Sequence, residues 1–119
     1  MTTLQRTPLY QSHVDNNGKI VDFSGWELPI HYGSQIDEHE AVRTDAGMFD
    51  VSHMGEVTVS GPDAERYVNH IFTNNVTRMA VGKILYGMML YEDGGTVDDL
   101  LVYKMGENDF LIVINASNI

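Results

Sequence analysis

The sequence predicts an α+β fold with a mostly antiparallel sheet and flanking helices. Four short segments, 56–59, 84–91, 96–104 and 110–115, are rich in apolar residues and are bounded by turn-forming residues, as is typical of strands. One amphipathic segment, 64–72, lies between the first of them and the other three. A strand, a helix and then three strands joined by short turns favour antiparallel pairing.

The amino-terminal part carries weaker signals. An Asn-Gly dipeptide at 17–18 predicts a tight hairpin turn, because both residues tolerate a positive φ, and it leads into the apolar segment 20–23. Ser34 is a favoured N-cap residue, two acidic residues follow it in the first turn, and Gly47 is a stop signal. We therefore expect a weakly amphipathic helix between Ser34 and Gly47.

From Glu56 onward the pattern is sharper. Gly-Pro at 61–62 opens a helix whose apolar residues follow the spacing of one helical face: Ala64, Tyr67, Val68, Ile71 and Phe72. Glu-Asp-Gly-Gly at 92–95 predicts a hairpin between the next two strands. The last strand, 110–115, is followed by no segment that could cover the sheet as a helix. We therefore interpret the chain as a truncated one.

The composition argues against several classes of function. Seventeen acidic residues stand against 7 basic ones, a formal net charge of -10, and the basic residues are scattered singly. Neither nucleic acid nor an anionic membrane is therefore an expected partner. No apolar run approaches the roughly 18 residues of a membrane span, and the start has neither a signal-peptide nor a transit-peptide pattern. The chain has no cysteine and so forms no disulfides, which is compatible with a reducing compartment. We therefore expect a cytoplasmic protein from a bacterium.

The segment 94–103, Gly-Gly-Thr-Val-Asp-Asp-Leu-Leu-Val-Tyr, is the most informative one for chemistry. Because alternate side chains share a face of a strand, Asp99 is expected beside the apolar Leu101 and Tyr103. A carboxylate on an apolar face costs several kcal/mol unless it is hydrogen-bonded or paired, so it marks a candidate site. Asp98 is expected on the other face, near the start of the strand, where water reaches it.

The cross-strand neighbours of Asp99 depend on the loop of the predicted hairpin. With an even number of loop residues, Tyr86 and Met88 share the face of Asp99; a three-residue loop places them on the other face. The alternative interpretation is that Asp99 is purely structural, and accepts hydrogen bonds from turn amides or pairs with an arginine.

Three other features are weak candidates. Asp50, Ser52 and His53 lie too close in sequence for a Ser-His-Asp triad, whose members come from separate segments. The histidines at 31, 39 and 53 match no common spacing of metal ligands. The Asp-Asn-Asn-Gly run near the start lacks the later Glu of a calcium loop. No metal site is therefore expected.

Six stretches of sequence are long and specific enough to compare with a known family. They include Val-Asp-Phe-Ser-Gly-Trp-Glu-Leu-Pro at 21–29 and Asn-Ala-Ser-Asn at 115–118, and the others are 6–10, 35–39, 41–54 and 94–103. In this order they resemble the glycine cleavage system T-protein, the tetrahydrofolate-dependent aminomethyltransferase. The chain is identified as an N-terminal fragment of a member of that family.

The resemblance implies a domain organisation. T-proteins are several-fold longer, with three domains arranged around a central tetrahydrofolate. Residues 1–52 would be the N-terminal piece of a discontinuous first domain. Residues 53–119 would be most of the second α+β domain, truncated at its C-terminal end.

The resemblance also implies a reaction in glycine catabolism and one-carbon metabolism. T-protein takes the aminomethyl group from the lipoyl arm of its partner, H-protein, releases ammonia and transfers the methylene to tetrahydrofolate. No metal takes part. The catalytic aspartate of the family matches Asp99, and the family's folate-contacting positions match Met54, Tyr86, Leu101, Tyr103 and Asn115. The isolated chain is expected to be inactive, because the basic residues that bind substrate carboxylates come later in T-proteins.

Two alternatives stay open from the sequence. One is a non-catalytic folate-binding relative, such as the iron–sulfur maintenance proteins, although the Asp98-Asp99 pair favours the catalytic family. The other is a structural fragment that binds no ligand and only self-associates through exposed apolar surface.

Overall fold

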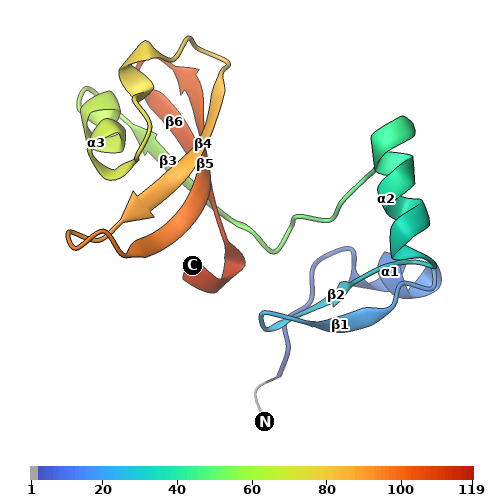
Figure 1. The fold of residues 1–119 in the computed structure, drawn as a ribbon. Coiled ribbons are helices and arrows are strands. Elements are labelled where there is room, and N and C mark those ends of the chain that lie inside the picture. The colour runs from blue at the N-terminus through green and yellow to red at the C-terminus, as the bar shows by residue number, and fades with distance from the viewer. Residues whose placement is uncertain (1–2) are drawn as a thin grey trace. The chain divides into compact units, whose positions relative to one another are not determined.

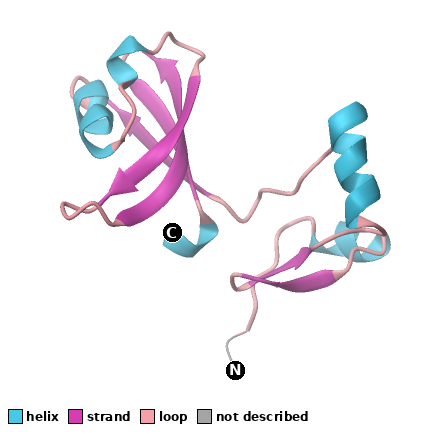
Figure 2. Cartoon of the chain, viewed as in Figure 1, coloured by secondary structure: helices cyan, strands magenta, loops and turns pink. Residues whose placement is uncertain are grey.

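The computed structural model describes residues 3–119, which form two compact units, one ending at His53 and the other spanning Met54–Ile119 (Figures 1 and 2). We call them unit 1 and unit 2. The sequence predicts a boundary between two domains at 52/53. That these units belong to two domains of a larger fold stays a prediction. No helix among residues 3–119 has the length and apolar character that crossing a membrane requires.

Unit 1 contains a helix, a hairpin and a second helix: α1 (Tyr10–Asp15), β1 (Ile20–Phe23), β2 (Trp26–Pro29) and α2 (Gln35–Thr44). The hairpin is antiparallel, and its tight turn is at Ser24 and Gly25, which have φ of 52° and 90°. The prediction of a hairpin turn at Asn17-Gly18 was therefore wrong. Asn17 does have a positive φ of 60°, but it lies just beyond the end of α1, where the Gly18 amide donates to the His13 carbonyl at 2.8 Å.

The second helix of unit 1 confirms the N-cap prediction. The Ser34 hydroxyl accepts a hydrogen bond from the Asp37 amide at 3.3 Å, and α2 ends at Thr44, shortly before Gly47. Elsewhere in unit 1 a buried polar cluster fixes the segment after α2. The buried His13 ring contacts Asp50 at 2.7 Å and the Tyr32 hydroxyl at 2.6 Å.

Unit 2 has the predicted element order: β3 (Gly55–Ser60), α3 (Ala64–Ile71), β4 (Ile84–Leu90), β5 (Thr96–Gly106) and β6 (Asp109–Ile114). Two short 3-10 turns, η1 (Val76–Arg78) and η2 (Ala116–Asn118), follow α3 and β6. The strands form one sheet in the order β3-β6-β5-β4, and every pairing is antiparallel. The α+β prediction with a mostly antiparallel sheet is confirmed.

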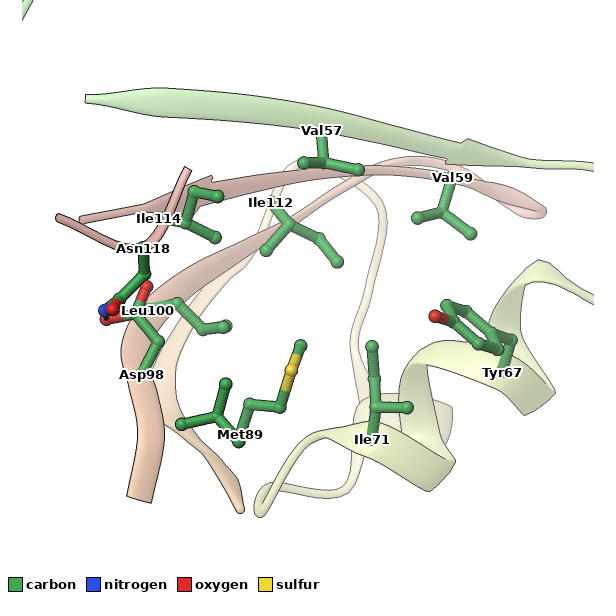
Figure 3. Close-up of a pocket in the computed structure, with 11 residues that line it drawn as sticks. Val57, Val59, Tyr67, Ile71, Met89, Asp98, Leu100, Ile112, Ile114 and Asn118 are labelled. Carbon is green, nitrogen blue, oxygen red and sulfur yellow. Dashed lines mark hydrogen bonds between the residues drawn. The ribbon is translucent and has the colours of Figure 1, made fainter. Parts of the chain in front are cut away.

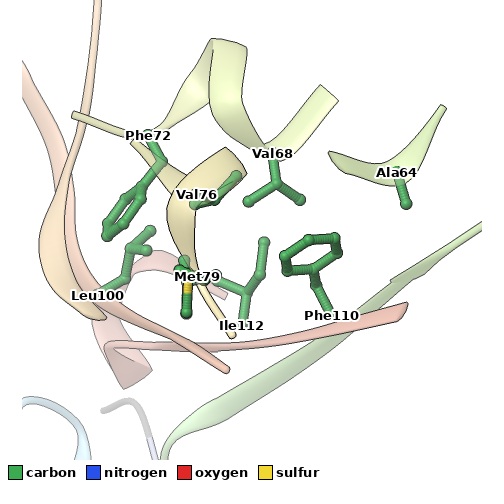
Figure 4. Packing of buried hydrophobic residues seen from close by; sticks show 9 residues of the cluster. Ala64, Val68, Phe72, Val76, Met79, Leu100, Phe110 and Ile112 are labelled. Carbon is green, nitrogen blue, oxygen red and sulfur yellow. The ribbon is translucent and has the colours of Figure 1, made fainter. Parts of the chain in front are cut away.

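The core of unit 2 lies between α3 and one face of this sheet (Figure 4). Its buried members come from α3, from the segment around η1, and from β5 and β6: Ala64, Val68, Phe72, Val76, Met79, Leu100, Val102, Phe110 and Ile112. The predicted helical stripe supplies three of them. Gly87 on β4 lies under the Phe72 ring, where an added Cβ would meet the ring at 2.6 Å, so this close approach requires glycine.

The hairpin between β4 and β5 sets which residues face the core. Five residues separate the two strands, an odd number, yet Tyr86 lies opposite Leu101 and Met88 lies opposite Asp99. The reason is a β-bulge: Leu90 pairs with Thr96 but Met89 pairs with Asp98, so one extra residue of β5 shifts the register. Tyr86 and Met88 therefore share the face of Asp99, as an even loop would have placed them.

Candidate functional site

The four-stranded sheet of unit 2 has two different faces. The closed face packs against α3 and includes Asp98, Leu100, Val102 and Lys104 from β5, all of which are buried. The open face is the opposite one, and we define it by Tyr86, Met88, Asp99, Leu101 and Tyr103. Within unit 2, Tyr86 and Met88 are 59% and 43% exposed, Asp99 is exposed, and the other two are half-buried.

Two side chains orient the Asp99 carboxylate on the open face. The Tyr86 hydroxyl donates to Asp99 Oδ2 at 2.8 Å, and Asn115 Nδ2 donates to Asp99 Oδ1 at 3.1 Å. Each oxygen thus has one donor from the protein and keeps acceptor capacity for another. The hydrogen bond to Asp99, together with desolvation, raises the pKa of Tyr86, so this hydroxyl stays protonated and donating.

Asp98 does not have the environment that was expected of it. The sequence predicts that water reaches Asp98 and that Asp99 lies on an apolar face. In the structure Asp98 is only 5% exposed and Asp99 is exposed. The alternation of the two residues was right, and the assignment of the buried face was wrong. Both faces of β5 are apolar in sequence, and the face that α3 covers is the one that carries Leu100 and Val102.

Hydrogen bonds compensate the burial of Asp98. Its Oδ2 accepts from the backbone amide of Asn115 at 3.0 Å. Its Oδ1 accepts from two side chains, from Asn115 Nδ2 at 2.8 Å and from Asn118 Nδ2 at 2.7 Å. Burial by itself raises the pKa of this carboxyl, but the donors from Asn115 and Asn118 outweigh it and hold the pKa of Asp98 below its usual value. Asp98 is therefore a buried anion with its partners in place.

Asn115 connects the two aspartates. It follows β6 directly, at the start of η2, and its side-chain nitrogen lies within hydrogen-bond distance of Asp98 Oδ1, Asp99 Oδ1 and the Asp99 carbonyl oxygen, the last at 2.8 Å. The strand pairing of β5 with β6 delivers it there, since Leu101 lies opposite Val113. Residues 16 and 17 positions apart in sequence thus meet at one end of the sheet.

Five of the six expected site residues share one side of unit 2. Asp99, Tyr86 and Asn115 are joined by hydrogen bonds, and Leu101 and Tyr103 follow Asp99 on the same face of β5. Met54 lies immediately before β3, and β6 separates that strand from β5.

Sequence reasoning missed Asp98 and Asn118 as partners of this cluster. The only sequence signal was the Asn-x-x-Asn spacing at 115–118. That spacing places two amide side chains on one short turn.

A small cavity lies on the closed face (Figure 3). It measures about 160 Å³, and apolar side chains of α3 and the sheet line most of it, with Asp98 and Asn118 together at one end. Sites for small molecules and cofactors are typically about 300–1,000 Å³. This cavity is therefore too small for such a ligand, whereas the open face is accessible. Among residues 3–119, no group of three or more His, Asp or Glu side chains is arranged to hold a metal ion.

Comparison with known proteins gives consistent matches. A family model for the GCVT N-terminal domain matches residues 9–119. Proteins named aminomethyltransferase from Bacillus mycoides (strain KBAB4) and from Bacillus cytotoxicus are 59% and 58% identical over all 119 residues, which cover 32% of each relative. A crystal structure of glycine cleavage system aminomethyltransferase T from Bartonella henselae matches with a TM-score of 0.84 at 32% identity, over 97% of this chain and 32% of that one. The chain thus spans about a third of the length of these relatives.

Proposed function

Since this chain belongs to the GCVT N-terminal domain family, the aminomethyltransferase family of the glycine cleavage system, we propose that it is part of a tetrahydrofolate-dependent aminomethyltransferase. The reaction takes the aminomethyl group from the lipoyl arm of H-protein, releases ammonia and transfers the methylene to tetrahydrofolate. These substrates and this partner belong to the whole enzyme, of which the present chain supplies one face of the site.

The observation that carries the proposal is the Asp99 carboxylate on the open face. Tyr86 and Asn115 each donate to one of its oxygens, so the carboxylate has a fixed orientation and retains lone pairs for N–H donors of a ligand. In the proposed mechanism Asp99 binds the pterin side of tetrahydrofolate and positions its nucleophilic nitrogen. The negative charge also stabilises the cationic carbon that the nitrogen attacks.

The other expected folate contacts suit a flat, partly apolar ligand. Tyr103 and Leu101 give the open face apolar and aromatic surface beside Asp99. Asn115 and Tyr86 add polar atoms that fix orientation, and Met54 is proposed as a further apolar contact. We also propose that residues 1–119 alone are inactive, because this surface is exposed here and substrate-binding residues of T-proteins come later in sequence.

The test uses the full-length protein that carries this sequence. Asp99→Asn keeps the volume of the side chain and removes its charge, and it is expected to lower kcat about 100-fold or more while the melting temperature changes little. Asp93→Asn is the matched control in the same hairpin, since its side chain only accepts from the Gly95 amide and asparagine can do the same. Turnover is measured with aminomethylated H-protein and tetrahydrofolate.

Four results would overturn parts of this proposal. Near-normal kcat in Asp99→Asn contradicts the catalytic role, as does a loss of activity that is explained by unfolding. A wild-type protein that binds tetrahydrofolate but transfers no methylene would be a non-catalytic relative. Turnover by residues 1–119 alone would contradict the proposed inactivity of the isolated chain.

A further inference from the structure

We propose that Asp98 is a positioning residue, which holds the Asn115 side chain and, through it, the Asp99 carboxylate; this inference rests on the proposed function. Asp98 and Asp99 are adjacent but point to opposite faces of the sheet, so Asp98 cannot touch a ligand on the open face. Its influence must pass through Asn115, the residue that bonds to both carboxylates.

The chemistry of the Asn115 side-chain amide supports this role of Asp98. An ionised carboxylate only accepts hydrogen bonds, so Asp98 at 2.8 Å fixes the NH₂ end of Asn115 toward the two aspartates. The carbonyl end then points away from both of them. If the amide were rotated by half a turn, its oxygen would face the oxygens of Asp98 and Asp99 and repel them. Asp98 Oδ1 and the Asp99 carbonyl oxygen, each 2.8 Å from Asn115 Nδ2, thus select together the orientation in which the amide also donates to Asp99 Oδ1.

The cost of burying the negative charge of Asp98 also supports this role. An apolar residue on the closed face would pack against Leu100 and the cavity without any desolvation penalty, whereas a buried carboxylate must be compensated by hydrogen bonds. Three donors from two residues provide that compensation at 2.7–3.0 Å. Two of the three come from Asn115, the residue that also donates to Asp99.

Asn118 gives the network its second support. It lies in η2, three residues after Asn115, and its Nδ2 donates to the same Asp98 oxygen that accepts from Asn115. Asp98 therefore holds both the residue that caps η2, Asn115, and the last residue of η2, Asn118, and the capping residue is the one that orients Asp99. A purely structural role for Asp98 would be to close this turn, and the experiment has to separate the two roles.

The experiment is a double-mutant cycle in the full-length protein, with Asp98→Asn, Asp99→Asn and both together. In Asp98→Asn the new NH₂ group competes with the donors of Asn115 and Asn118, so the Asn115 amide loses one of its three acceptors and shifts from the position in which it donates to Asp99. We expect kcat to fall about 10-fold or more, since displacements of about 1 Å can cost 100-fold. In the Asp99→Asn background the same change should cost less than about 3-fold, because the residue through which it acts is already disabled.

The outcomes separate this inference from the proposed function. If Asp99→Asn retains normal kcat, the proposed function fails, and the inference fails with it. If Asp99→Asn loses activity but Asp98→Asn does not, or if their losses multiply in the double variant, only the positioning role is overturned. Asp93→Asn again serves as the matched Asp-to-Asn control.

Asn118→Ala covers the case in which Asp98→Asn does not fold. It removes one donor to Asp98 and leaves Asn115 and Asp99 unaltered. We expect kcat to fall about 3-fold in the otherwise wild-type protein and to stay unchanged in the Asp99→Asn background, a dependence on Asp99 that loss of stability would not produce. Equal effects in both backgrounds, or no effect in either, overturn the positioning role.

Discussion

Two adjacent residues of β5, Asp98 and Asp99, have different surroundings because they lie on opposite faces of the four-stranded sheet. On the closed face, Asp98 is buried with its donors, beside Leu100 and Val102. On the open face, Asp99 is exposed and is oriented by Tyr86 and Asn115. The same side-chain chemistry is therefore buried and fully bonded on one side, and is accessible to a ligand on the other.

The difference shows that the surroundings of a strand residue are decided by what covers each face. In β5 the two faces are almost equally apolar, so the alternation of side chains does not identify the buried one. The amphipathic helix α3 determines which face is buried, because its apolar stripe packs over the face that also carries Phe110 and Ile112. The proposed site lies on the face that α3 leaves open.

The largest contrast between the faces should be seen in stability. Phe110 is 0% exposed on the closed face, and Phe110→Ala is expected to lower the free energy of unfolding by about 3–5 kcal/mol through the cavity it leaves. Met88 on the open face is 43% exposed, and Met88→Ala should cost about 1 kcal/mol or less. Denaturant unfolding measures both. Similar losses for the two variants would contradict the assignment of the faces.

A smaller contrast is expected between two ion pairs of α3. On the closed face the Lys104 side chain is 4% exposed and its ammonium contacts Glu65 at 2.7 Å, whereas the Asp63–Arg66 pair is 76–83% exposed. Lys104→Met keeps the apolar stem and removes the charge, and should cost about 2 kcal/mol. Arg66→Ala should cost less than about 0.5 kcal/mol. Unfolding curves that rank the two variants in the opposite order would contradict the importance of the buried pair.

The strand and helix signals of unit 2 predicted its fold well, because the α3 stripe and the turn residues of the hairpins are local. The features that failed depend on long-range packing or on backbone detail. The turn at Asn17-Gly18 follows helix α1, which was not predicted from the sequence. The hairpin of unit 1 turns instead at Ser24-Gly25.

The candidate site was foreseen only in part. Its open-face members follow from strand alternation and from the family resemblance. The bulge that brings Tyr86 onto the face of Asp99 has no clear sequence signal. The burial of Asp98 could not be derived either, because it depends on which face α3 covers and on the partners that η2 supplies.

The stability of the fold at acid pH should depend on Asp98, the carboxylate on the closed face. The pKa of Asp98 is lowered in the folded state, so its contribution to stability is present above about pH 4, the unfolded value, and is lost as pH falls through the folded pKa. Melting temperatures between pH 7 and pH 2.5 should fall more steeply below pH 4 for the wild type than for Asp98→Asn. Parallel curves would contradict the compensation of the buried charge.

Asp50 of unit 1 is half-buried as a residue, with a side chain only 4% exposed, and it should respond to acid in the same direction. Burial raises the pKa of this carboxyl, but hydrogen bonds from Thr7, Ser52 and His13 outweigh burial and hold the pKa far below its usual value. Asp50→Asn should therefore also flatten the dependence of stability on pH below pH 4. A steep acid loss that survives in this variant would have another cause.

The weakest expected effect is self-association of the isolated chain. Apolar side chains are exposed on the open face and in the segment after α2, where Phe49 is 71% exposed. Light scattering over a concentration series should show a dimer or a larger species, and Met88→Glu should shift it toward monomer. A monomer at the highest concentrations would contradict this prediction.

The most direct test of the functional difference between the two faces is a crystal structure of the full-length protein with tetrahydrofolate bound. We predict that the pterin lies over the open face with its N–H groups donating to Asp99, while Asp98 stays buried and bonded to Asn115 and Asn118. A folate that lies away from Asp99, or that enters the cavity between α3 and the closed face, would contradict the account.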